Sequence, residues 1–318
     1  MQLVSVIIPS YNHDLYIRET IQSVINQDYE NIELIIIDDG SKDNSISIIE
    51  EMIPACKKRF KRFEFRARPN IGLSKTLNES LSWVNGEFIS PVASDDILLS
   101  NKISTLMAAI EKNKSIDVIF GDARFIDKKT EELELSVISP ITLFNINVRS
   151  FLLQQTASRF NYKDESIFGT YESLLDGNYL PAMSCLIRTT KLIEVDGWDE
   201  NISIEDWGLW LKLSKVAKFS LIDEEVALYR IHGKNSDDLI RPVIAFDAYY
   251  LLKNEKNYAL NLGFKNKYYK NLAARVYSLR KTSSYSMILE LFKGFHSLTF
   301  VKCLFFHVLF KLLVRLFK

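Results

Sequence analysis

The sequence has few of the features that mark secreted, nucleic-acid-binding or membrane-spanning proteins. Its only cysteines are Cys56, Cys185 and Cys303; they form no CxxC pair or plausible disulfide framework, so we expect a reduced, cytoplasmic setting. Lysine plus arginine and aspartate plus glutamate both number 40, and this balance argues against a nucleic-acid partner. Met1 leads into a short apolar run that Pro9 ends, too short for a signal peptide. No uncharged apolar stretch reaches the roughly 18 residues of a spanning helix.

Glycine-rich phosphate loops are also missing from the sequence. It has no GxxxxGK[ST] motif, and no GxGxxG follows the first predicted strand. If a nucleotide binds here, its phosphates need another source of positive charge, and Mg²⁺ or Mn²⁺ held by carboxylates is the obvious candidate. The same absence argues against a nucleotidyltransferase, because that class of enzyme would need such a loop near the N-terminus.

What the sequence does contain is an alternation of strand-like and helix-like segments over its first 125 residues. Period-two or continuous apolar runs predict strands, and apolar residues spaced three and four apart predict helices. Strands are expected at 3–8, 32–38, 63–67, 87–92 and 116–122, and helices at 15–27, 44–58, 71–84 and 101–112. Such alternation predicts βαβ units and a mostly parallel α/β sheet flanked by helices.

Polar clusters follow four of the predicted strands. They are "PSYN" at 9–12, "DDGS" at 38–41, "RPN" at 68–70 and the carboxylate pair Asp95-Asp96. Ligands of open α/β sheets bind at the carboxyl ends of the strands, so these clusters form a candidate site. Each has a simpler interpretation as well: "SDD" could cap a helix, and "DDGS" could be a turn.

Several segments, in order and at matching spacing over residues 1 to 232, resemble family 2 glycosyltransferases of the GT-A fold. They are residues 4–45, residues 68–98, "GWDENISIEDWGLWLKL" at 197–213 and "YRIHG" at 229–233. The resemblance implies a Rossmann-like GT-A domain. It also implies transfer of a sugar from a nucleotide diphosphate donor to an acceptor hydroxyl, with inversion at the anomeric carbon.

The resemblance assigns roles to residues of the nucleotide side. Pro9, Tyr11 and Asn12 match the first nucleotide-contact motif, in which Tyr11 would stack on the base. Asp39, beside Asp38, matches the carboxylate that accepts from a base N3–H, which uracil has and cytosine lacks. Asn70 matches a segment near the nucleotide. A UDP-sugar is therefore the expected donor.

The resemblance also implies a metal site and a catalytic base. Asp95 and Asp96 match the metal motif, with Asp95 toward the ribose or a metal-bound water and Asp96 directly on the metal. Ala93 stands where the fuller pattern has a further acid, which leaves a thinner ligand set. Asp206, beside Glu205, matches the general base. Without the resemblance, these two acids could simply be a favourable pair at a helix N-terminus.

Further residues are candidates for the acceptor or diphosphate side. Arg230 and His232 in "YRIHG" match positions that line the diphosphate or metal, and Arg188 is a weaker candidate. Trp198, Trp207 and Trp210 cluster around the acid pair. Trp207 is equally compatible with an acceptor platform and with core packing, and the other two are expected in the core.

From about residue 238 the sequence turns helical, and its last 26 residues form a basic, aromatic-rich amphipathic pattern. Lys293, His296, His307, Lys311, Arg315 and Lys318 fall in one sector of a helical projection, with Lys302 opposite. This pattern is typical of a helix that lies in a membrane interface, although a helix docked on the catalytic domain or a dimer contact would also fit.

Together these observations predict a GT-A catalytic domain at 1–235 and a helical extension at 236–318. We expect a metal-dependent inverting hexosyl- or N-acetylhexosaminyltransferase, peripheral on the inner face of the cell membrane. Its acceptor would be a glycan on a polyprenyl diphosphate lipid, as in O-antigen or capsule biosynthesis. The alternatives are a nucleotidyltransferase and a catalytically silent nucleotide-binding protein.

Overall fold

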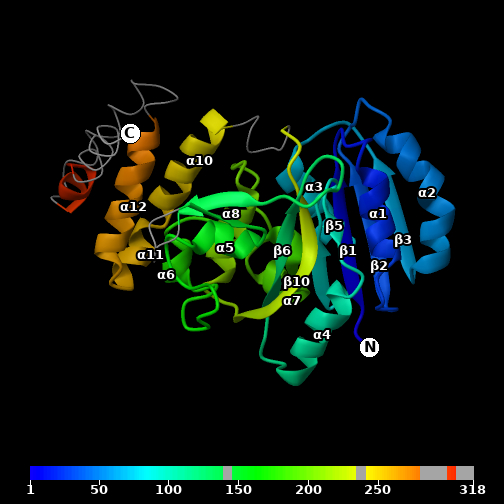
Figure 1. The fold of residues 1–318 in the computed structure, drawn as a ribbon, viewed down its shortest axis with the longest axis horizontal. Helices are drawn as coiled ribbons and strands as arrows, with labels where there is room; N and C mark the ends of the chain where they lie inside the picture. Colours follow the sequence, from blue (N-terminus) through cyan, green and yellow to red (C-terminus); the bar gives the residue numbers. More distant parts are fainter. Residues whose placement is uncertain (139–144, 234–240, 280–298, 306–318) are drawn as a thin grey trace.

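The computed structural model describes residues 1–138, 145–233, 241–279 and 299–305. Its largest feature is an eight-stranded sheet with helices on both faces (Figure 1). The strands of this sheet are β1 (Val4–Ser10), β2 (Ile32–Asp38), β3 (Arg62–Ala67), β4 (Phe88–Pro91), β5 (Ile97–Leu98), β6 (Val118–Ile126), β9 (Cys185–Arg188) and β10 (Phe219–Arg230). A separate antiparallel pair consists of β7 (Leu135–Ile138) and β8 (Asn145–Val148).

The helices of the described residues are α1 (Ile17–Ile25), α2 (Ser45–Arg59), α3 (Leu73–Leu81), α4 (Lys102–Lys112), α5 (Phe151–Thr156), α6 (Tyr171–Leu174), α7 (Thr189–Glu194), α8 (Glu205–Leu213), α10 (Arg241–Asn254), α11 (Lys256–Asn261) and α12 (Lys265–Ser278). In the first 125 residues, the ends of helices α1 to α4 lie within three residues of the predicted ends. A short 3₁₀ turn, η1 (Ala182–Ser184), precedes β9.

The sheet is mostly parallel, as the sequence predicts. Its strands lie in the order β3-β2-β1-β4-β9-β6-β10-β5. β1 to β4 run in one direction, and β6 and β10 run the same way because β9 is antiparallel to both β4 and β6. The carboxyl ends of these six strands therefore meet at one edge of the sheet. β5 and β9, which the sequence did not reveal, run the opposite way.

Side-chain alternation along the strands divides the interior into two apolar layers. Ile8 and Ile36 pack with α1, α2 and α4, whereas Ile7 and Ile35 pack with α3, α8 and the C-terminal helices. Both faces of β2 are thus covered, and all seven of its residues are buried. This explains its near-continuous run of isoleucine, which is typical of a sheet buried on both sides.

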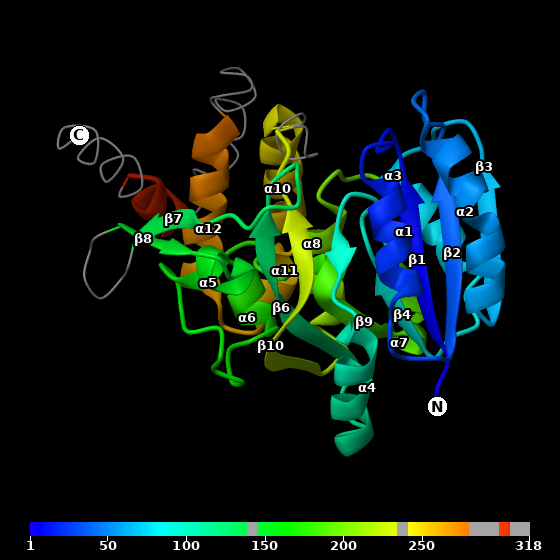
Figure 2. The same cartoon turned by 45° about the vertical axis from the view of Figure 1, so that its right-hand side comes forward.

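Helices α10 to α12 share an apolar core with α8 and one face of the sheet. They stand at the end of the molecule opposite β2, β3 and α2 in Figure 1, and Figure 2 again shows them well separated from these elements. Arg275 of α12 lies over the Trp207 ring, 5.0 Å from its centroid. Glu255 binds Lys215 and the Tyr171 hydroxyl at 2.7 and 2.8 Å. The predicted boundary at 235/236 falls in residues 234–240, outside the described residues.

The predicted membrane-interface helix also lies largely outside the described residues, which include only 299–305 of it. There Phe300 is buried and its ring lies 6.5 Å from that of Tyr269, so this segment packs on α12. Among the described residues, no helix combines the length and the hydropathy needed to cross a bilayer.

Candidate active site

The polar ends of neighbouring strands are joined directly to one another at the carboxyl edge of the sheet. The Ser10 hydroxyl at the end of β1 donates to Asp38 at the end of β2 over 2.9 Å. The backbone N–H of Arg68, after β3, donates to the Asp38 carbonyl. The strand order β3-β2-β1-β4 thus gathers the four predicted clusters on one side of the molecule.

Asp38 is a structural carboxylate of this edge. It is fully buried and accepts from the backbone N–H groups of Gly40 and Ser41 as well as from the Ser10 and Ser41 hydroxyls. Its oxygens are therefore occupied in holding the loop after β2. A direct contact between Asp38 and the nucleotide, as the resemblance implies, would require one of these protein donors to be released.

Asp39 joins the loop after β2 to the loop after β3. Its carboxylate accepts from the backbone N–H groups of Ile71 and Gly72 at 2.8 and 2.9 Å, and it pairs with Arg68. Asn70 lies in the same connection and is exposed. Asp39 therefore lies close to Asn70, and protein donors engage both of its oxygens.

The loop after β1 presents an aromatic ring to solvent. Pro9 pairs with Ile37 inside the sheet, whereas Tyr11 is 46% exposed, which leaves its ring free to stack on a flat ligand. Asn12 adopts a left-handed φ of 53° and is fixed on both sides. Its N–H donates to the Ser41 hydroxyl, and its side-chain oxygen accepts from the Lys42 N–H at 2.7 Å.

Asp95 and Asp96 point to different partners within the protein. Asp96 is buried, and one of its oxygens accepts from the Arg230 N–H at 3.0 Å. Burial, followed by the neighbouring charge of Asp95, raises the pKa of Asp96 well above its ordinary value. Asp95 instead faces two imidazoles: its oxygens lie 3.0 Å from His232 Nε2 and 3.9 Å from His13 Nδ1. The structure thus groups Asp95, and not Asp96, with possible metal ligands.

His13 is a site residue that sequence reasoning missed. It follows Asn12 directly, and its Nδ1 lies 2.7 Å from the Ser94 hydroxyl. Burial of the ring lowers the pKa of His13, against the opposing charge of Asp95. Its place directly after a strand-end motif was visible in the sequence, but only the sheet order brings it to Asp95, which lies 82 residues later.

The end of β10 closes this site from the opposite side. Arg230 is fully buried and donates to the backbone carbonyls of Asp95 and Asp127 and to the Glu19 carboxylate. Its guanidinium lies 4.8 Å from the centroid of the Tyr16 ring, and His232 stacks on the same ring at 5.0 Å. Arg230 therefore orders the backbone around Asp95 and is not open to a diphosphate in this conformation.

Asp206 and Glu205 form the first turn of α8 and are both half-buried. The charge of Asp206 contributes to raising the pKa of Asp96, so the two carboxyls lie within electrostatic reach across the site. A half-buried carboxylate of this kind is chemically able to accept a proton from a bound hydroxyl.

The remaining predicted residues are engaged in packing or in ion pairs within the protein. Trp207 is 4% exposed and its indole N–H donates to the Leu174 carbonyl at 2.8 Å, so core packing and not an acceptor platform describes it. Trp198 and Trp210 are buried as expected. Arg188 pairs with Glu87 and Asp117 at the amino ends of β4 and β6.

The residues present fit a divalent cation. The ligand atoms of His13, Asp95 and His232 all lie within 4.8 Å of one another, the one such group found in the described part of the chain. Metal–ligand bonds of about 2.0–2.2 Å place opposite donors roughly 4.4 Å apart. Donor atoms at this spacing can share one cation after small shifts of the side chains.

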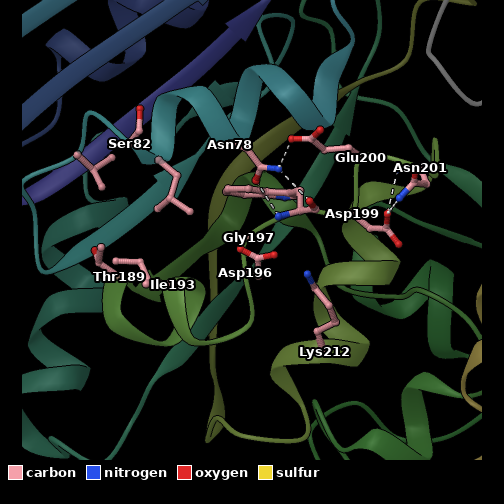
Figure 3. Close-up of a pocket in the computed structure, with 13 residues that line it drawn as sticks. Asn78, Ser82, Thr189, Ile193, Asp196, Gly197, Asp199, Glu200, Asn201 and Lys212 are labelled. Atoms are coloured by element: carbon pink, nitrogen blue, oxygen red, sulfur yellow. Dashed lines mark hydrogen bonds between the residues drawn. The ribbon is translucent and has the colours of Figure 1, made fainter.

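A cavity lies toward the other edge of the sheet. It has a volume of about 830 Å³, and its lining residues come from α3, α7 and α8 and from the connection between the last two (Figure 3). Thr189, one of them, donates its N–H to Glu87 before β4, which marks the amino ends of the strands. Asn78 braces this cavity by binding the backbone of Trp198 and the side chain of Glu200. It is distinct from the cluster at Asp95.

The fold and this edge site define the class of the protein: a GT-A type glycosyltransferase fold. Staphylococcus aureus TarS, solved with UDP-GlcNAc, superposes with a TM-score of 0.53 at 20% identity, over 87% of this chain and 81% of that one. The mannosyltransferase PcManGT of Pyrobaculum calidifontis, solved with GDP-Man and Mn²⁺, gives 0.58 at 13% identity, over 92% and 79%.

Residues 5–169, just over half of the chain, match the model of Glycosyl transferase family 2, and the chain belongs to that family. A glycosyltransferase of Rickettsia felis is 29% identical over 240 residues, which are 75% of this chain and 36% of the relative. The chain thus spans about a third of that relative's length.

Proposed function

We propose that this protein is an inverting glycosyltransferase that moves a sugar from a nucleotide diphosphate donor to a hydroxyl group of a glycan. The observation that carries the proposal is the arrangement at the carboxyl edge. There, Asp95 and two imidazoles form a possible cation site, and the half-buried Asp206 lies within electrostatic reach of it. Membership of glycosyl transferase family 2 supports the same reaction class.

The proposed chemistry assigns separate tasks to the two halves of the site. An acceptor hydroxyl is a weak nucleophile, so Asp206 would accept its proton as the oxygen attacks the anomeric carbon from the side opposite the diphosphate. General bases of this kind typically contribute about 10²–10⁴-fold in rate. Asp95 and His232 would hold the divalent cation, which when bound offsets the charge that develops on the leaving diphosphate.

For the donor, we propose a UDP-sugar carrying a hexose or an N-acetylhexosamine. The exposed Tyr11 ring offers a stacking surface, and Asp39 would accept from the uracil N3–H if it gave up one of its present donors. TarS was solved with UDP-GlcNAc and PcManGT with GDP-Man and Mn²⁺, so UDP and GDP donors are the two to compare. A donor screen with Mn²⁺ or Mg²⁺, measuring released nucleotide, tests this part.

For the acceptor, we propose a glycan on a polyprenyl diphosphate lipid, in the synthesis of a surface polysaccharide such as O-antigen or capsule. The protein would then work at the inner face of the cell membrane, held there by the basic helix predicted at 293–318. This part rests on the family resemblance and on the sequence of that helix. If protein truncated after Gly294 fractionates with membranes as fully as the whole chain, the helix does not anchor it.

The decisive test of the proposed base is Asp206→Asn. This variant should lose sugar transfer by about 10²-fold or more, because the amide cannot accept the proton, while nucleotide binding stays within about twofold. Glu200→Gln is the matched control, since it removes a carboxylate six residues earlier that faces Asn78 in the cavity lined by α3, α7 and α8. Wild-type transfer by Asp206→Asn would contradict the assignment.

Two other functions remain to be separated from this one by experiment. A nucleotidyltransferase would release diphosphate from a nucleoside triphosphate, whereas the proposed enzyme would release a nucleoside diphosphate from a nucleotide sugar. A catalytically silent binding protein would bind nucleotide but show no slow hydrolysis of any nucleotide sugar.

A further inference from the structure

We infer that His13 is a protein ligand of the divalent cation and that the resulting pair of imidazoles selects a transition ion such as Mn²⁺ over Mg²⁺. The inference rests on the proposed function, which supplies the cation. The proposed function places the cation on Asp95, after β4, and His232, after β10. The inference adds His13, from the loop after β1, as a third ligand.

His13 lies close to Asp95 and His232. Its Nδ1 lies 3.9 Å from one oxygen of Asp95, while His232 Nε2 lies 3.0 Å from the other oxygen. The two imidazole rings meet edge to face with centroids 5.7 Å apart. A single carboxylate thus stands between two nitrogen donors, an arrangement in which a cation could touch all three side chains.

The loop that carries His13 is held in place by the loop after β2. The His13 N–H donates to the Ser45 hydroxyl at 3.0 Å, and the next N–H, of Asp14, donates to the Asp43 carboxylate at 3.0 Å. The Ser94 hydroxyl lies 2.7 Å from His13 Nδ1, a contact that is released when this nitrogen turns its lone pair to the cation. Little conformational freedom remains to be lost when a cation binds, which favours binding.

Among the described residues, the cluster of His13, Asp95 and His232 contains no carboxylate besides Asp95. Asp96 is buried and engaged by the Arg230 N–H, and Ala93 has no donor atom. The side-chain donor set is therefore two nitrogens and one carboxylate. Mg²⁺ prefers oxygen ligands, whereas imidazole nitrogen suits first-row transition ions better. This donor set should discriminate against Mg²⁺.

The test measures the cation's ligands directly. Pulsed EPR of Mn²⁺ bound to the full chain with UDP, and in parallel with GDP, should show nitrogen coupling from two imidazoles. In His13→Asn one coupling should disappear, and the Mn²⁺ dissociation constant, followed by continuous-wave EPR, should rise about 10–100-fold. His13→Asp, which replaces a nitrogen by a carboxylate, should shift the measured preference toward Mg²⁺.

Tyr16→Phe is the matched control, because it changes the ring that stacks on His232 without removing a nitrogen donor. It should retain both couplings, and thermal unfolding would show that each variant is folded. If wild type and His13→Asn show the same nitrogen coupling and the same Mn²⁺ dissociation constant, the His13 assignment is overturned. The metal site of the proposed function then still stands. If the wild type binds no Mn²⁺ with either nucleotide, the inference fails together with the metal dependence of the proposed function.

Discussion

Lys102 is a fully buried lysine whose hydrogen-bond partners are both neutral. Its side chain is fully buried at the start of α4, and its Nζ donates to the Ser90 hydroxyl and the Met183 carbonyl at 2.6 and 2.7 Å. Burial lowers the pKa of Lys102 to about 8. A lysine held in this way disfavours its own protonated form, so it weakens the fold at neutral pH.

This predicts a stability that rises with pH on the alkaline side. The folded-state pKa lies below the unfolded one, so the unfolded state binds more protons between them, and the penalty is largest below about pH 8 and fades toward the unfolded pKa of 10.5. Relative to Lys102→Met, which cannot titrate, the wild type should gain about 2 kcal/mol in unfolding free energy between pH 7 and 9.5. Urea unfolding at both pH values measures this difference, and parallel pH curves for the two proteins would refute it.

At the residue scale, the sequence predicted which residue types gather at the site better than it predicted their orientations. Asp95 and Asp96 are adjacent, yet one faces two imidazoles and the other a backbone N–H. This difference in orientation depends on how the turn after β4 meets β10. Arg230, whose backbone N–H binds Asp96, lies 134 residues further along the chain. His13 was missed for the same reason, since its partners come from other strands.

At the scale of elements, the loop after β2 depends on one glycine. Gly40 has a φ of +80°, and a Cβ there would lie 2.7 Å from the backbone nitrogen of Asn70 and 3.1 Å from the Arg68 carbonyl oxygen. The loops after β2 and β3 can approach this closely only without a side chain at position 40. Their approach brings Asp39 and Asn70 together.

Gly40→Ala should therefore destabilise the protein and weaken nucleotide binding. The left-handed φ alone costs an alanine about 1–2 kcal/mol, and separating the two loops adds to that cost. Gly263→Ala is a matched control: its φ is +84°, but no atom lies within 4 Å of the added Cβ. Calorimetric titration with UDP should find weaker binding for Gly40→Ala alone. Equal effects of the two substitutions on unfolding and binding would contradict the close-approach argument.

Elements that follow a local period were predictable, and those that depend on distant partners were not. Ile17, Ile21 and Val24 are spaced as one face of a helix, and they are buried along α1. In contrast, β9 has only four residues and pairs antiparallel between β4 and β6, which lie more than 55 residues before it. No local pattern distinguishes such a strand from a buried loop.

At the scale of the whole molecule, the C-terminal helices and the catalytic part share one apolar cluster. Trp207 and Trp210 of α8 belong to the same cluster as Leu252 of α10 and Tyr268 of α12. The sequence showed a change in composition near residue 238 and so predicted a separate extension. Burial across that boundary could not be inferred from composition, because it depends on which faces of the helices meet the domain.

This shared core predicts that the described parts of the chain unfold together. Tyr268 is 1% exposed, so Tyr268→Ala should lower the unfolding free energy by about 3–5 kcal/mol, as expected for removing a large buried ring. Tyr250→Ala, at a tyrosine of α10 that is 43% exposed, is the control and should change it by less than about 0.5 kcal/mol. In urea, tryptophan fluorescence, which reports the region of α8, and far-ultraviolet circular dichroism should follow a single transition, and Tyr268→Ala should shift it as a whole. Two separate transitions, with the fluorescence change unmoved by Tyr268→Ala, would instead mean that the helices form a unit that folds independently.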